Sequence, residues 1–117
     1  MNRLVTLCVV LLLAACGASE EGTQRVQLEV ASRSLVPADK ELAEIYNRSC
    51  RSCHTVAATG APLTGDVAAW AERMEKGPEV LLENVIAGFG GMPPFGLCMD
   101  CDADEFDALI AFMAKGK

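Results

Sequence analysis

Hydrophobic residues recur at helical spacing through the C-terminal two-thirds of this 117-residue chain. An apolar residue at every third or fourth position marks one face of an α-helix, and no run alternates convincingly enough to indicate a strand. The three clearest stripes are Leu42, Ile45 and Tyr46; Leu81, Leu82, Val85, Ile86 and Phe89; and Phe106, Leu109, Ile110 and Met113. The pattern predicts an all-α domain of about four to five short helices whose stripes form its core.

Polar residues mark where some of these helices begin and end. Asp102 is followed three residues later by Glu105, a capping signature that predicts the start of the last helix. Residues 66–76 form a fourth, shorter helical segment, and Gly77-Pro78 is expected to end it.

The N-terminal segment, residues 1–15, has the pattern of a signal peptide. Arg3 supplies a positive charge, Leu4 to Leu13 is apolar, and Ala14-Ala15 provides small residues before a cleavage point. The apolar run is shorter than the roughly 20 residues that a membrane-spanning helix needs. The sequence therefore predicts export from the cytoplasm.

The residues around the cleavage point, Leu13-Ala14-Ala15-Cys16, resemble the lipobox of bacterial lipoproteins. The resemblance implies that Cys16 is lipidated and becomes the mature N-terminus. The alternative is an ordinary cleavage site that happens to precede a cysteine. We expect the protein on the periplasmic side of a bacterial membrane, held by its lipid, or in the soluble periplasm if Cys16 is unmodified.

Residues 16–36 are polar and lack a strong helical period, so they are expected to form a flexible, lipidated tether. Val26, Leu28 and Val30 alternate with polar residues, which leaves a short extended piece possible. Residues 37–117 then form one domain, which is small for a self-sufficient hydrophobic core.

The net charge of the chain is −6, and it becomes −7 without the signal segment because Arg3 is the single charged residue there. An acidic surface argues against nucleic acid and against anionic lipid headgroups as partners. It is compatible with steering towards basic patches on partner proteins, and equally with plain solubility.

Cys50-Arg51-Ser52-Cys53-His54 is the most informative segment, because C-x-x-C-H is the attachment sequence for c-type haem. Its two thiols can each add to a porphyrin vinyl group, and His54, the only histidine of the chain, can ligate the iron. Zinc sites space their Cys pairs by about 15–20 residues, and Cys98 lies much farther from Cys53. A dithiol redox motif and a pair of buried thiols are the remaining alternatives. The predicted export from the cytoplasm favours one covalently bound haem over both.

Four methionines are candidates for the second axial ligand: Met74, Met92, Met99 and Met113. Met92 lies in Gly90-Gly91-Met92-Pro93-Pro94, where glycines permit close approach to a flat ring and prolines stiffen the chain. Electron-carrying cytochromes often combine His and Met ligands. We therefore expect His54 and Met92 to bind the iron.

The remaining cysteines are accounted for by this assignment. Cys8 is lost with the signal segment, Cys16 is acylated, and Cys50 and Cys53 bind haem, which leaves Cys98 and Cys101 to pair. Residues three apart in a turn are close enough for a disulfide. It is expected to fix the turn between the Met92 loop and the last helix.

Residues 38–117 resemble the cytochrome c5-type monohaem c-type cytochromes, a group of class I cytochromes c. The resemblance rests on Cys50 to His54 together with the following residues: Tyr46, Gly60-Ala61-Pro62, Gly65-Asp66, Ala69-Trp70, Arg73, Lys76-Gly77, Gly88, Met92-Pro93-Pro94, Gly96 and Cys98-Met99-Asp100-Cys101. It implies the cytochrome c fold, one haem c with His/Met ligation, a disulfide in the second Cys pair, and Trp70 near the haem edge. An ordinary core position is the alternative for Trp70.

Three functions are compatible with these features. The first is a one-electron carrier, a monomer that meets redox protein partners at a bacterial membrane. The second is a fixed subunit or docked donor of a membrane oxidase or reductase. The third, a haem enzyme or gas sensor, needs a free iron site and ranks last, because no catalytic cluster accompanies the haem motif. We therefore expect an electron transfer protein without a small-molecule substrate, not an enzyme.

Overall fold

The computed structural model describes residues 19–117, so the predicted signal peptide and Cys16 lie outside the described residues. Within them the chain is helical, and its one bridge, between Phe89 and Met92, builds no sheet. The elements are α2 (Glu20–Ser34), α3 (Lys40–Ile45), η1 (Tyr46–Cys50, one π-helical turn), α4 (Arg51–His54), η2 (Ala57–Thr59), α5 (Val67–Met74), α6 (Pro78–Ala87), η3 (Pro94–Leu97) and α7 (Ala103–Lys115). The all-α prediction is confirmed.

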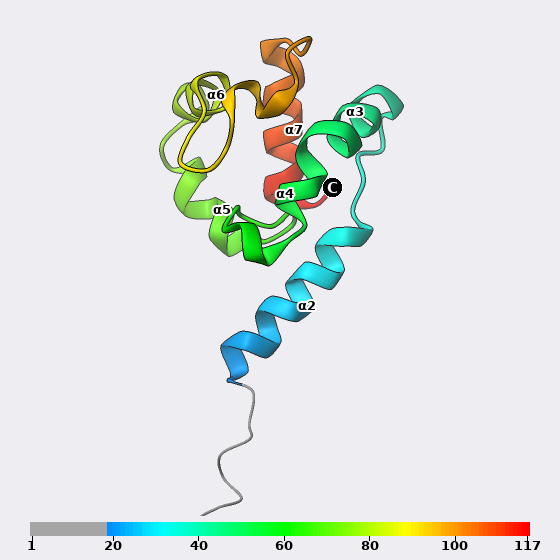
Figure 1. The fold of residues 1–117 in the computed structure, drawn as a ribbon, viewed down its shortest axis with the longest axis vertical. Coiled ribbons are helices and arrows are strands. Elements are labelled where there is room, and N and C mark those ends of the chain that lie inside the picture. The colour runs from blue at the N-terminus through cyan, green and yellow to red at the C-terminus, as the bar shows by residue number, and fades with distance from the viewer. Residues whose placement is uncertain (1–18) are drawn as a thin grey trace, which may run out of the picture.

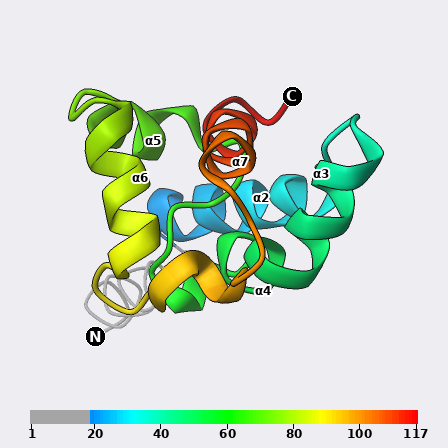
Figure 2. The same ribbon diagram turned by 90° about the horizontal axis from the view of Figure 1, so that it is seen from above.

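Helix α7 forms the centre of the domain, with α3, α5 and α6 packed around it (Figure 1; Figure 2). Its buried face carries the predicted stripe plus two further residues, and consists of Phe106, Leu109, Ile110, Phe112, Met113 and Ala114. Tyr46 is fully buried and meets Phe112 edge-on, with ring centroids 5.1 Å apart. The apolar stripes thus meet in one core.

Capping residues begin and end the helices close to where the sequence suggests. Asp102 accepts from the Glu105 N–H, and the Glu105 carboxylate accepts from the Asp102 N–H, which completes the capping box of α7. Asp66 caps α5 through the Ala69 N–H. Gly77 precedes α6, and Pro78 occupies its first position, where a missing N–H costs nothing.

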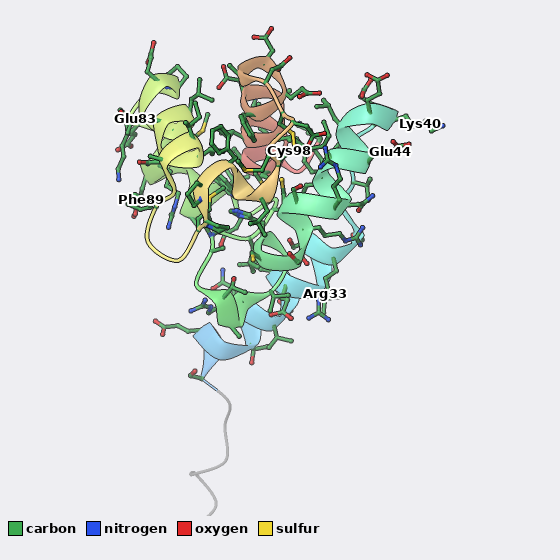
Figure 3. All side chains as sticks on the ribbon, turned by 45° about the horizontal axis from the view of Figure 1, so that its top comes forward. Arg33, Lys40, Glu44, Glu83, Phe89 and Cys98 are labelled. Atoms are coloured by element: carbon green, nitrogen blue, oxygen red, sulfur yellow. A yellow bond between two sulfur atoms is a disulfide. The ribbon has the colours of Figure 1, made fainter. Side chains whose placement is uncertain are left out.

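The prediction that the second helical stripe extends to Phe89 is wrong. Helix α6 stops at Ala87, because Gly88 has a φ of +83° and turns the chain out of the helix. Phe89 lies beyond it at the outer edge of the molecule and is 62% exposed (Figure 3).

The expectation of a flexible tether over residues 16–36 is wrong for residues 20–34, which form α2. Ser19 caps this helix by accepting from the Gly22 N–H, and Glu20 and Glu21 favour its positive N-terminal end. Helix α2 has few apolar residues to bury. Hydrogen bonds with Thr55 and Ala57 join it to the rest of the chain. No helix within residues 19–117 is long and apolar enough to cross a membrane.

Candidate haem-binding site

The two cysteines of the C-x-x-C-H motif lie on one helical turn, where η1 passes into α4. Both are free thiols; Cys50 is half-buried beside the core and Cys53 is exposed. Residues three apart share a helical face, so both sulfur atoms can reach one planar group. Burial raises the pKa of Cys50 to about 11, so this thiol is protonated at neutral pH.

His54 ends α4 and is 6% exposed. Its Nδ1 lies 2.8 Å from the Pro62 carbonyl oxygen. Because a carbonyl only accepts, Nδ1 carries the proton and the lone pair of the neutral ring is on Nε2. The pKa of His54 is lowered mainly by burial, and the positive charge of Arg73 also lowers it. A neutral imidazole with one nitrogen fixed by a carbonyl is the form that binds metals.

A buried polar network surrounds the imidazole. Trp70 stacks against it at 5.8 Å between ring centroids, with planes 28° apart, and donates from Nε1 to the Leu63 carbonyl at 2.9 Å. The Tyr46 hydroxyl lies 2.9 Å from the Thr64 hydroxyl, and the Thr64 N–H donates to the His54 carbonyl at 2.7 Å. Burial raises the pKa of Tyr46, which keeps its hydroxyl neutral. These contacts fix both the imidazole ring and the backbone carbonyl of His54.

Met92 is half-buried at the end of a tight loop. The Phe89 N–H donates to the Met92 carbonyl at 3.1 Å, and the Met92 N–H donates to the Phe89 carbonyl at 2.9 Å. This pair closes a two-residue turn over Gly90-Gly91. The side chain of Met92 packs against the hydrophobic core. The loop therefore holds a thioether beside the core with little freedom to move.

Two glycines make this loop possible. A Cβ at Gly88 would lie 2.9 Å from the Met92 carbonyl oxygen and 3.1 Å from the Pro94 nitrogen, so the backbone passes too closely for a side chain. At Gly96 a Cβ would lie 3.1 Å from the Met92 methyl carbon. Both have positive φ angles, which glycine adopts without strain. The geometry explains why these positions of the sequence pattern are glycine.

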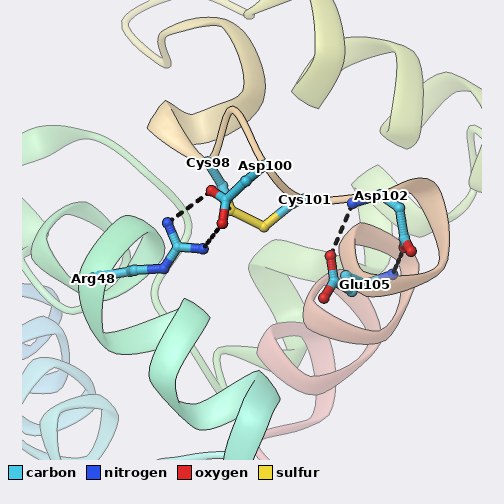
Figure 4. Close-up of a disulfide and its surroundings, with 6 residues drawn as sticks. All are labelled: Arg48, Cys98, Asp100, Cys101, Asp102 and Glu105. Atoms are coloured by element: carbon cyan, nitrogen blue, oxygen red, sulfur yellow. Dashed lines mark hydrogen bonds and ion pairs between the residues drawn. A yellow bond between two sulfur atoms is a disulfide. The ribbon is translucent and has the colours of Figure 1, made fainter.

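The turn after η3 is held by a disulfide and an ion pair (Figure 4). In the structure the sulfur atoms of Cys98 and Cys101 are bonded. Arg48 of η1 donates to both carboxylate oxygens of Asp100, at 3.0 and 2.8 Å. The pKa of Asp100 is lowered mainly by the hydrogen bonds that Arg48 donates. Because η1 carries Cys50, this ion pair links the haem motif to the segment that follows Met92.

The other methionines have different surroundings. Met113 is buried in the core, whereas Met74 and Met99 are 41% and 72% exposed. Sequence reasoning did not identify Pro62, Thr64 or Ser32 as neighbours of His54. Their contacts use backbone carbonyls and hydroxyl groups, and no local pattern in the sequence marks such contacts.

The residues fit a covalently attached haem. Two free thiols share one helical turn, the adjacent imidazole has its lone pair on Nε2, and a soft thioether lies in a stiff loop. Within residues 19–117 no hydrogen bond occupies Nε2. Two thiols followed by an imidazole are the groups that covalent haem attachment uses, and a thioether is one of the iron ligands found in cytochromes c.

Comparisons with known proteins identify the family. The model of the family described as cytochrome c oxidase, cbb3-type, subunit III, matches residues 37–113. Cytochrome c5 of Ectopseudomonas mendocina is 40% identical over 73 residues, covering 61% of this chain and 84% of that protein. Cytochrome c5 of Azotobacter vinelandii is 37% identical over 73 residues, covering 61% and 88%. The chain belongs to the cytochrome c5-type monohaem cytochromes of class I.

A solved structure shows the same fold. It is described as an electron transfer complex of nitrite reductase with cytochrome c, and one of its chains matches with a TM-score of 0.59 and 32% identity. The match covers 68% of this chain and 98% of that chain. The predicted cytochrome c fold is confirmed, and the chain is a haem c electron carrier with a covalently bound haem.

Proposed function

We propose that this protein is an extracytoplasmic one-electron carrier whose haem iron is ligated by His54 and Met92. The observations that support the proposal are the fixed imidazole of His54 and the fixed loop that carries Met92. His54 is the only histidine of the chain, and its Nδ1 is occupied by the Pro62 carbonyl. Met92 is the methionine that lies in a bridged, glycine-shaped loop beside the core.

A bound haem supplies the reversible one-electron couple. The protein residues keep its surroundings constant: Pro62 and Trp70 hold the ring of His54, and the Phe89–Met92 bridge holds the thioether. His54 and Met92 together would leave no free position at the iron for water or a small substrate. A thioether ligand also raises the reduction potential relative to a second imidazole. Rigid ligands and a closed iron site favour electron transfer over catalysis.

The proposal extends to the other cysteines. Cys98 and Cys101 are oxidised in the native protein, which is compatible with an oxidising compartment. Cys16 is lipidated and attaches the protein to the periplasmic side of a bacterial membrane. Leu13-Ala14-Ala15-Cys16 supports this attachment through its likeness to a lipobox.

The partners are proposed to be redox proteins. Support comes from the solved complex, in which a cytochrome c of the same fold meets nitrite reductase. The description of the matching family favours a second candidate, a subunit or docked donor of a membrane oxidase. The cytochrome c5 relatives, of which this chain covers 84% and 88%, favour the separate carrier. Co-purification from membranes with an oxidase distinguishes the two.

Substitution of Met92 tests the ligand assignment. In Met92→Ala we expect the weak sulfur-to-iron absorption band of the oxidised protein to disappear, and carbon monoxide to bind the reduced form. Met99→Ala is the matched control, because Met99 is exposed at the neighbouring turn. If Met99→Ala loses the band and Met92→Ala keeps it, the assignment is wrong.

A further inference from the structure

Helix α2 docks on the segment that carries His54, on the side of the domain where α4 and η2 lie (Figure 1; Figure 2). This helix precedes residues 37–113, the part that the family model matches. Family membership therefore does not account for it.

The docking contact is centred on Ser32, which has no exposed surface. Its hydroxyl donates to the His54 carbonyl oxygen at 3.1 Å. That oxygen also accepts from the Thr64 N–H at 2.7 Å. One hydrogen bond from α2 and one from the loop after η2 thus fix the same carbonyl.

Further polar contacts surround the Ser32 hydroxyl. The Glu29 carboxylate accepts from the Ala57 N–H at 2.8 Å, and Arg33 donates from Nε to the Thr55 carbonyl at 3.5 Å. Arg51, inside the haem motif, donates to the Arg33 carbonyl. Figure 3 shows Arg33 on α2 beside this segment. The backbone after His54 is therefore hydrogen-bonded to α2 at Thr55 and at Ala57.

Leu35, just after α2, fixes the position of the helix. Its Cδ1 atom fills a notch formed by Gly65 and Gly116, where a Cβ would lie only 2.7 Å and 3.0 Å away. The Gly65 N–H donates to the Met113 carbonyl, which joins one side of the notch to α7. The absence of side chains at both glycines gives Leu35 its place. An apolar contact and a set of polar ones thus hold the same end of α2.

We propose that α2 is a fixed part of the haem site and that Ser32 is a positioning residue for the proximal ligand His54. This inference rests on the proposed ligation by His54. The Ser32 hydroxyl acts through the His54 carbonyl and has no contact with the iron. It restrains the backbone from which the imidazole projects, while Pro62 restrains the ring.

The test compares Ser32→Ala with Ser34→Ala in the full-length haem-containing protein. Ser34 is an exposed serine of the same helix that bonds only within it, to the Ala31 carbonyl. In Ser32→Ala we expect about fivefold faster hydrogen exchange at the amides of α2, Ala57 and Thr64, the effect of one lost hydrogen bond. We also expect displaced paramagnetically shifted proton resonances of the His54 ring. Ser34→Ala should match the wild type in both measurements.

A second variant, Leu35→Ala, keeps the hydroxyl but empties the notch. It should speed exchange in α2 and displace the His54 resonances in the same direction as Ser32→Ala, since both variants loosen the same end of α2. Faster α2 exchange with unmoved His54 resonances in Ser32→Ala overturns the positioning role. So does a displacement that Leu35→Ala shows and Ser32→Ala lacks. If the wild type itself has no shifted imidazole resonances, the ligand assignment fails and this inference fails with it.

Discussion

At the residue scale, the site depends on contacts that tolerate little change. Trp70 combines a buried indole, a stacking contact with His54 and a hydrogen bond to Leu63. Gly88 lets the backbone cross beside Met92. In both cases a single side chain, or the lack of one, determines where a proposed iron ligand lies.

Substitution of Trp70 separates its two contributions. Trp70→Phe retains an aromatic ring but leaves the Leu63 carbonyl without its donor, which should cost about 2 kcal/mol of unfolding free energy. Trp70→Ala also creates a cavity and should cost about 3–5 kcal/mol. Denaturant unfolding of the haem-containing protein measures both. A Trp70→Phe variant as stable as the wild type would show that the indole N–H contributes nothing, and equal losses in the two variants would show that the aromatic ring adds nothing.

Substitution of Gly88 should displace Met92. In Gly88→Ala the new Cβ meets backbone atoms that cannot rotate away, so we expect carbon monoxide to bind the reduced protein. Gly90→Ala is the matched control, because Gly90 also has a positive φ, +58°, but no atom lies within 4 Å of its added Cβ. That variant should lose about 1–2 kcal/mol of stability and keep the ligand. If both variants bind carbon monoxide similarly, backbone strain alone displaces Met92, and the contact of the new Cβ at residue 88 does not matter.

At the scale of elements, short helices are fixed by their ends and by links between them. Helix α7 begins at a complete capping box, and the turn before it is joined to η1 by Arg48 and Asp100. The π-helical turn η1 runs directly into α4, so this ion pair restrains the haem motif from the opposite end to α2.

The cap of α7 can be tested directly. Asp102→Ala removes the acceptor for the Glu105 N–H and should lower the free energy of unfolding by about 1 kcal/mol. Asp104→Ala removes a carboxylate from the same first turn without removing a cap. It should cost less, which thermal unfolding of both variants can measure. An equal loss would mean that charge near the helix end, and not the cap, stabilises α7.

The Arg48–Asp100 pair predicts a pH dependence. Because Arg48 lowers the pKa of Asp100 in the folded protein, the stabilisation is complete above the ordinary carboxyl pKa and is lost as the pH falls through the lowered value. Asp100→Asn should therefore be less stable than the wild type near neutral pH and should approach it in acid. Denaturant midpoints across the acidic range measure this. Glu83→Gln, which alters an exposed carboxylate on α6, should show no such convergence.

At the scale of the whole molecule, α2 changes how the domain relates to its N-terminus. A flexible segment of about twenty residues would let the domain move freely, whereas a docked helix moves with it. The proposed anchor at Cys16 lies four positions before Glu20, where α2 begins. The haem domain would remain close to its point of attachment and sample fewer orientations towards its partners.

The proposed lipid anchor gives a prediction at this scale. Cys16→Ser should leave haem attachment and the absorption spectrum unchanged but move the protein from the membrane fraction to the soluble periplasm. Electron exchange with membrane partners should slow through lost local concentration. Mass spectrometry of the N-terminus provides the check. A wild-type protein that is soluble with an unmodified N-terminus would leave a diffusible carrier.

The sequence by itself determined the chemistry and most helices of this protein. C-x-x-C-H defines haem attachment because the spacing of two thiols on one helical turn is a local property. The stripes of α3, α6 and α7 predict helices because amphipathic periodicity is local as well. The Asp102–Glu105 signature located the start of α7 for the same reason.

Only the tertiary structure decided which distant groups meet. Residues 20–34 have a weak apolar pattern, and their helix is held by contacts with Thr55, Ala57 and the notch at Gly65 and Gly116. Likewise, the Ser32 hydroxyl and the Pro62 carbonyl reach His54 because of how the chain folds back. Hydrogen bonds to backbone atoms of residues distant in the sequence depend on spatial placement and leave no signature in residue type, so the sequence could not reveal them.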